Sequence, residues 1–195
     1  MQHLIIFTRY PEPGKTKTRL IPALGAEGAA KFHRQMAEDI VKTVREFSFS
    51  NSVSLEIRYT GGSLELMQDW LGADLVYNLQ GTGDLGDRLI GCLQDAFDRE
   101  KTAIIVIGTD CPDVSSDIFS EAYEKLQHQD VVLGPAEDGG YYLIGLSRFI
   151  PEIFVGINWG TSEVFQQTLA ICKTLNLSVE FLPQLADIDR PEDLK

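Results

Sequence analysis

Short apolar runs alternate along this chain with longer stretches in which apolar residues recur at helical spacing. The runs are bounded by turn residues, as buried strands are, whereas residues 26–47 place Phe32, Met36, Ile40 and Val44 on one face of a helix. This alternation predicts an α/β fold with a mainly parallel sheet. The expected strands are 4–8, 53–60, 74–78, 103–108, 130–134, 141–146 and 178–182, and the expected helices are 26–47, 63–70, 86–99, 116–128 and 161–175.

The length of the chain, 195 residues with 44% hydrophobic content, suits one domain spanning 1–195, and no repeat or linker divides it. The apolar runs are far shorter than the roughly 18 residues that cross a bilayer, and the N-terminus lacks a signal-peptide pattern. The three cysteines form no C-x-x-C pair, which favours a reducing compartment. We therefore expect a cytoplasmic protein without a membrane partner.

The charge of the chain is strongly acidic, with 17 Lys and Arg against 29 Asp and Glu and a formal net charge of −12. Nucleic acid is therefore not expected as a partner, because a surface that binds it needs an excess of cations. The segment 9-RYPEPGKTKTRL-20 is an exception, since it contains four cations and one acid. We expect this local cluster to hold a small anion.

Polar or glycine-rich segments follow several of the expected strands. In parallel α/β sheets, ligands bind beyond the carboxyl ends of the strands, where loops carry the chemistry. Because these ends share one edge of the sheet, we expect the segments to meet there. The segments are 9–19, 81–88, 108–113, 135–140 and 187–194.

The first segment presents Lys15, Lys17 and Arg19 beside a glycine. Residues 14-GKT-16 match the end of a phosphate-binding P-loop, but Arg9 stands where that motif needs its first glycine, so a P-loop is not predicted. The cations suit a pyrophosphate, because arginine offers a fork of donors and lysine a compact charge. The alternative is a solvated turn without a ligand.

Two acidic segments suggest a metal site. Asp110 follows the strand expected at 103–108, where a carboxylate suits a hard cation that also takes phosphate oxygens. Its alternative role is a turn or a helix cap, although Asp113 fits a cap better. Asp189 either completes the metal site or caps the last helix in a capping box with Glu192.

Three further features have two interpretations each. Asp138 precedes two glycines that suit either a close ligand or a plain turn. The segment 81-GTGDLG-86, which includes Gly83 and Asp84, matches a dinucleotide fingerprint, but an acid in the pyrophosphate loop argues against that site. Trp159 either forms a platform for a base or sugar or covers the core.

Six motifs follow one another along nearly the whole chain. They are 9-RYPEPGKTKTRL-20, 83-GDLGDRL-89, 108-GTDCPD-113, 138-DGGYYLIGL-146, 158-NWGTSEV-164 and 187-DIDRPEDL-194. This ordered set resembles the GT-A-fold nucleotide-diphospho-sugar transferase superfamily. Within it, the resemblance is to a small single-domain branch of glycosyltransferases of the arsenosugar-biosynthesis type, related to phospholactate guanylyltransferases and molybdenum-cofactor nucleotidyltransferases. The resemblance implies a Rossmann-like three-layer sandwich.

The resemblance implies that Gly14, Lys17 and Arg19 bind the nucleotide and its diphosphate, and that Asp110 and Asp189 coordinate the metal. It also implies a substrate pocket lined by the glycine-flanked acid and its neighbours. These are Asp138, Gly139 and Gly140.

The chain departs from the family pattern at two points. Arg9 replaces a lysine after the first strand, which keeps the charge but changes its geometry. The metal motif spaces Asp110 and Asp113 three residues apart, in place of the D-x-D of many glycosyltransferases.

We therefore expect a metal-dependent transferase in which Lys17 and Arg19 neutralise the diphosphate of a nucleotide sugar while Asp110 holds Mg²⁺ or Mn²⁺. A small molecule would be the acceptor. One alternative is a nucleotidyltransferase that joins a nucleoside triphosphate to a small phosphorylated acceptor and releases pyrophosphate, and another is a non-catalytic nucleotide-binding module. Further nucleotide or substrate contacts are expected from Arg9, Lys15, Gly83, Asp84 and Trp159.

Overall fold

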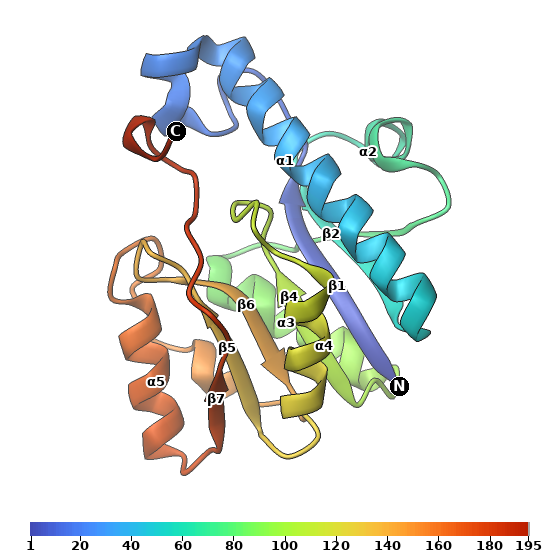
Figure 1. Ribbon diagram of the computed structural model, residues 1–195, viewed down its shortest axis with the longest axis vertical. Helices are drawn as coiled ribbons and strands as arrows, with labels where there is room; N and C mark the ends of the chain where they lie inside the picture. The colour runs from blue at the N-terminus through green and yellow to red at the C-terminus, as the bar shows by residue number, and fades with distance from the viewer. Residues whose placement is uncertain (195) are drawn as a thin grey trace.

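The computed structural model describes residues 1–194, which form one seven-stranded sheet between two layers of helices (Figure 1). The strand order is β3-β2-β1-β4-β6-β5-β7, and every neighbouring pair is parallel except the two that contain β6. The α/β fold and all seven expected strands are confirmed. The strands are β1 Gln2–Arg9, β2 Ser54–Thr60, β3 Val76–Leu79, β4 Ala103–Ile107, β5 Val131–Pro135, β6 Tyr141–Leu146 and β7 Val179–Phe181.

The helices form the outer layers, each with its own core against the sheet. Residues from α1, α2 and α4 pack on one face, and residues from α3, α5 and η2 pack on the other. The five expected helices are confirmed, and three short 3-10 helices add to them. The elements are α1 Ile21–Asn51, α2 Leu64–Leu71, α3 Leu85–Asp98, α4 Ser116–Lys125, α5 Val164–Thr174, η1 Thr18–Leu20, η2 Pro151–Phe154 and η3 Pro191–Asp193.

The central strands are buried on both faces, which explains their continuous apolar sequences. Leu4, Ile5 and Ile6 of β1 are fully buried, as are Ile104 and Ile105 of β4. Since side chains alternate between the faces of a strand, these runs contribute to both cores at once.

The cap of one helix and the start of another differ from the sequence-based expectation. Helix α4 begins at Ser116 as expected, but its N-cap position is Ser115, so Asp113 lies in the turn before the helix and does not cap it. Helix α5 begins at Val164 rather than at 161, and Thr161 lies before it and donates a hydrogen bond to the Asn158 carbonyl at 2.7 Å. In both cases a further turn of chain separates the strand-end motif from the helix.

The first helix is also longer than expected, since it begins at Ile21 and bends at Gly25, whose φ is 71° and ψ 169°.

Within residues 1–194, no helix combines the length and the apolar composition needed to cross a membrane. Three cysteines, Cys92, Cys111 and Cys172, are free thiols buried in the protein.

Candidate functional site

All five loop segments contribute to a single pocket of about 500 Å³ at the edge of the sheet where β1, β2, β3 and β4 end. The expectation that these distant segments meet is therefore confirmed. One part of the wall is charged, and the other is built from apolar residues of the α3 core, including Phe7, Leu89 and Ile144. Such a division suits a ligand with a charged end and a flat or apolar end.

The basic loop is closed by its own hydrogen bonds. The Thr16 hydroxyl donates to the Tyr10 carbonyl and accepts from the Glu12 amide, both at 3.1 Å. The Arg9 guanidinium lines the pocket and donates to the Lys15 carbonyl at 2.8 Å. The Lys15 ammonium is exposed and pairs with Glu12 at 2.7 Å, so in this conformation it is directed away from the pocket.

Lys17 is the buried cation of this loop. It adopts a left-handed conformation, with φ and ψ both 47°, and its side chain is only 5% exposed. Its ammonium donates to the Ile188 carbonyl at 2.5 Å and lies 2.9 Å from the Asp110 carboxylate and 3.4 Å from that of Asp189. It therefore sits behind the pocket wall, joining the basic loop to the C-terminal segment.

Arg19 extends the same cluster to the surface, since its guanidinium lies 2.6 Å from Asp189. The two cations and the two carboxylates predicted for diphosphate and metal binding, Lys17, Arg19, Asp110 and Asp189, thus form one charge-balanced group. In Figure 1 the C-terminal segment, in red, returns to the start of α1, in blue, as these contacts require. Arg19, Asp110 and Asp189 line the pocket directly.

The predicted capping box at Asp189 is wrong. The last helix, η3, begins at Pro191, and the carboxylate that accepts from the Asp189 and Arg190 amides is that of Asp193, at 3.0 and 2.7 Å. Neither Asp189 nor Glu192 caps it. The Asp189 carboxylate is free of a capping role because the chain is extended until Arg190, one residue later than the sequence pattern suggests.

Asp187 is a pocket residue that the sequence-based site did not include. Its carboxylate accepts from the Asp138 amide at 3.2 Å. Burial raises the pKa of Asp187, and the neighbouring negative charge of Asp138 raises it further. The sequence offered one signal for Asp187. It lies two residues before Asp189, and alternate residues of an extended segment point to the same side.

The segment 138–140 forms a turn, and its backbone at Gly139 lies close to the backbone of Ser162. The Asp138 carboxylate accepts from the Gly140 amide at 2.8 Å, and both residues line the pocket. Gly139 has φ of 89°, and a Cβ there would lie 2.3 Å from the Ser162 carbonyl oxygen. Its glycine is therefore required by the backbone that leads into α5.

The segment 81–88 also has a structural explanation for two of the expected site residues. Asp84 caps α3 and forms a capping box with Asp87, and a Cβ at Gly83 would lie 2.2 Å from the Asp87 carboxylate. The residue of this segment that brings charge to the pocket is Arg88, whose Nε donates to the Gly83 carbonyl at 3.1 Å. It was not among the predicted residues.

Trp159 packs against the core on the α3 face of the sheet and also lines the pocket, so its role as a platform for a base or sugar stays a prediction. Its ring meets Tyr141 edge to face, with centroids 6.4 Å apart. The His33 ring also lines the pocket and is 2.9 Å from the Arg9 carbonyl. Burial lowers the pKa of His33, so a neutral ring that donates to this carbonyl supports the basic loop.

The carboxylates suit a divalent metal only in an open site. Within the described residues, no group of three or more His, Cys, Asp and Glu side chains could hold a metal ion by itself. Asp110 and Asp189 share the Lys17 ammonium, so they already surround one positive charge. Magnesium in proteins commonly uses one or two carboxylates together with waters and substrate phosphates. The donor set fits that kind of site.

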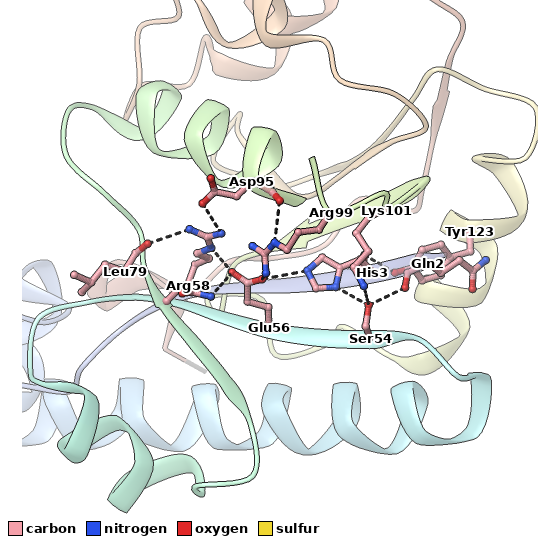
Figure 2. Close-up of polar contacts among 11 residues, drawn as sticks. Gln2, His3, Ser54, Glu56, Arg58, Leu79, Asp95, Arg99, Lys101 and Tyr123 are labelled. Atoms are coloured by element: carbon pink, nitrogen blue, oxygen red, sulfur yellow. Dashed lines mark hydrogen bonds and ion pairs between the residues drawn. The ribbon is translucent and has the colours of Figure 1, made fainter. Parts of the chain in front are cut away.

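A second polar cluster lies on the α3 face of the sheet (Figure 2). Glu56 of β2 is 1% exposed and lies beside His3, Arg58 and Arg99. Burial raises the pKa of Glu56, but a hydrogen bond with His3 and the charge of Arg58 outweigh this effect and lower it to about 2. Glu56 is therefore a buried, ionised carboxylate at neutral pH.

Comparison with known proteins identifies the family. A family model described as "Uncharacterized protein conserved in bacteria (DUF2064)" matches residues 43–161, and the chain belongs to this family. A crystal structure from Desulfovibrio desulfuricans G20, of a protein provisionally named a nucleotide-diphospho-sugar transferase, has 36% sequence identity and a TM-score of 0.92. The match covers 100% of this chain and 85% of that protein. No curated protein matches the sequence.

More distant structures share the fold. A 4-diphosphocytidyl-2C-methyl-D-erythritol synthase from Anaerococcus prevotii has a TM-score of 0.63 at 10% identity, over 98% of this chain and 92% of that one. The manganese complex of Rv0371c from Mycobacterium tuberculosis has a TM-score of 0.61 at 14% identity, over 99% and 96% of the two chains. At these identities the likeness concerns the fold alone.

Proposed function

We propose that this protein is a metal-dependent transferase that acts on a nucleotide-linked substrate, with a nucleotide sugar as the donor. The proposal rests on one observation, the charge-balanced cluster of Lys17, Arg19, Asp110 and Asp189 at the sheet edge. Without a ligand, the two cations and two carboxylates of this cluster pair with one another. When a diphosphate and its metal bind, these internal ion pairs are replaced by contacts with the ligand. The exchange conserves charge, because the diphosphate takes the cations and the metal takes the carboxylates.

The residues have distinct roles in this proposal. Asp110 and Asp189 hold Mg²⁺ or Mn²⁺, which supplies positive charge for the phosphate oxygens. Arg19 binds the diphosphate from the pocket wall, and Lys17 turns toward it as the carboxylates leave its ammonium. Both side chains stabilise the charge that develops on the departing nucleotide, where fixed cations are most effective.

The remaining expected contacts divide by position. Arg9, Asp138, Gly140 and Trp159 line the pocket, so we assign them to substrate binding. Gly14, Gly83, Asp84 and Gly139 shape the loops, and Lys15 would contribute only by turning from Glu12.

The relative from Desulfovibrio desulfuricans supports sugar transfer, since its name is that of a nucleotide-diphospho-sugar transferase. The narrower arsenosugar-type specificity is part of this proposal. The second candidate is nucleotidyl transfer, because proteins named as cytidylyltransferases share the fold, including one from Leptospira borgpetersenii with a TM-score of 0.56. The same cluster could serve both reactions, because each develops charge on phosphate oxygens.

The products distinguish the two candidates. The test begins with a thermal-unfolding screen of nucleoside triphosphates and nucleotide sugars, each with and without Mn²⁺, because ligands of the native state raise its apparent stability. The best ligands are then incubated with candidate acceptors. Release of a nucleoside diphosphate supports sugar transfer, and release of pyrophosphate supports nucleotidyl transfer. If no nucleotide raises the unfolding temperature under any of these conditions, the proposed function is wrong.

A further inference from the structure

Gln80, which follows β3, is a buried side chain on the wall of the pocket. Its amide nitrogen donates two hydrogen bonds to main-chain carbonyls, to Thr8 of β1 at 2.9 Å and to Arg58 of β2 at 3.1 Å. Both N–H groups of the amide are thereby used. The side chain spans two neighbouring strands of the rigid sheet.

The orientation of this amide is fixed by its partners. Exchanging its nitrogen and oxygen would break both hydrogen bonds and place Oε1 against two carbonyl oxygens, which are acceptors only. Within residues 1–194, no hydrogen bond to Oε1 is found, and this oxygen is not among the side-chain atoms sealed from solvent without a partner. Gln80 lines the pocket, and Oε1 is the side-chain atom that its two hydrogen bonds leave available, so we take Oε1 as the acceptor that this residue offers to a ligand.

The segment that carries Gln80 is itself held by the Glu56 cluster (Figure 2). The Arg58 guanidinium donates to the Leu79 carbonyl at 3.3 Å and to the Asp95 carboxylate of α3 at 2.9 Å, and it also pairs with Glu56. Arg58 thus supports Gln80 in two ways. Its carbonyl accepts from the Gln80 amide, and its guanidinium holds Leu79, the residue before Gln80. A preorganised acceptor of this kind loses little freedom when a ligand binds.

We propose that Gln80 selects the nucleobase, and that it favours a base with an amino group over the counterpart that carries a carbonyl or hydrogen at that position. This inference rests on the proposed nucleotide site. An amino group donates to Oε1, whereas a carbonyl would face another acceptor and leave both unpaired. The same pocket suits a base, because Leu85 and Leu89 offer apolar contacts and Arg88 a donor for a ring nitrogen or carbonyl.

The experiment compares nucleotides that differ in one group. Binding of CTP against UTP, ATP against ITP and GTP against ITP is measured by isothermal titration in the presence of Mn²⁺. The parent protein is expected to bind the amino-bearing member of at least one pair about tenfold more tightly, as one buried hydrogen bond allows. In Gln80→Leu, and in the unbranched variant Gln80→Met, that ratio is expected to fall close to one.

Two controls separate selection from folding. Inorganic pyrophosphate with Mn²⁺ should bind both Gln80 variants as it binds the parent, because it carries no base that could contact residue 80. Gln35→Leu, the same substitution at an exposed position of α1, should keep the parent's ratio. Two outcomes would overturn the role of Gln80 while leaving the proposed function intact. In the first, the parent binds nucleotides equally within every pair, and in the second, the Gln80 variants bind pyrophosphate and still show the parent's ratio of affinities. A parent that binds no nucleotide would overturn the proposed function with it.

Discussion

At the scale of single residues, Lys17 and Arg19 differ in burial, with side chains 5% and 57% exposed. Changing either to Ala should weaken nucleotide binding by about 1.5–3 kcal/mol, the value of one charge-assisted hydrogen bond. Lys17→Ala should also lower the free energy of unfolding, because it leaves the Ile188 carbonyl without its donor, whereas Arg19→Ala should not. Titration calorimetry and urea unfolding measure the two effects.

The matched control for these substitutions is Lys31→Ala, which removes an exposed cation from α1 outside the pocket. It should bind the nucleotide as the parent does. Parent-like affinity in both Lys17→Ala and Arg19→Ala would show that the basic loop does not bind the nucleotide, and that its ion pairs serve the fold alone.

Asp110 and Asp113 provide a paired test within one loop. Asp110 lines the pocket beside Lys17, whereas Asp113 is exposed and caps no helix. Asp110→Asn should remove the Mn²⁺ dependence of nucleotide binding, because an amide keeps the shape but lacks the charge that a hard cation requires. Asp113→Asn should leave it unchanged. Titrating nucleotide at several Mn²⁺ concentrations measures both, and the reverse pattern would disprove the assignment of Asp110.

Asp189 and Asp193 form a second pair, near the C-terminus. Asp189→Asn should weaken Mn²⁺ binding in the presence of nucleotide, since its carboxylate is one of the two around Lys17. Asp193→Asn should bind Mn²⁺ as the parent does, because its carboxylate accepts from two amides and asparagine also caps. Equal Mn²⁺ affinities in parent and Asp189→Asn would rule out a metal-binding role for Asp189.

At the scale of the elements, Glu56 connects β2 to β1 and α3. Its pKa is lowered from 4.5 to about 2 in the folded protein, so its ionisation contributes about 3 kcal/mol to stability above pH 4.5, and this contribution is lost as the pH falls toward 2. Glu56→Gln should therefore be least stable relative to the parent at neutral pH, and the difference should shrink below pH 4.5. Urea midpoints across this range measure it, with the exposed Glu27→Gln as control. A difference that does not change with pH would contradict this account.

The elements themselves were largely predictable from the sequence, because the central strands β1 and β4 are apolar on both faces and the helices that cover them are apolar on one. Their ends were less predictable. Asp113 and Asp189 both look like caps when only the next few residues are considered, yet the helices begin at Ser116 and Pro191, after turns set by tertiary contacts. A local pattern cannot distinguish a capping carboxylate from one that a distant lysine binds.

At the scale of the whole molecule, the parallel topology made the location of the pocket predictable from loops scattered along the chain. The contacts within it were not. Lys17 contacts Asp189, which lies 172 positions away in the sequence, and the orientation of the Gln80 amide is set by carbonyls of two other strands. Sequence patterns identified the charged residues of the site, but which of them pair with one another depends on the folded geometry.

The central claim is that this pocket binds a nucleotide diphosphate together with a divalent metal, and thermal unfolding of the parent protein tests it most directly. ADP, CDP, GDP and UDP are each added with and without Mn²⁺, beside Mn²⁺ alone. At a hundredfold excess over its dissociation constant, a ligand of the native state adds about 2.7 kcal/mol of stability. We predict that at least one nucleotide with Mn²⁺ raises the unfolding temperature well beyond either component alone, and that Asp110→Asn loses this rise. An unfolding temperature that no nucleotide changes, or a rise that needs no metal and persists in Asp110→Asn, would contradict the account.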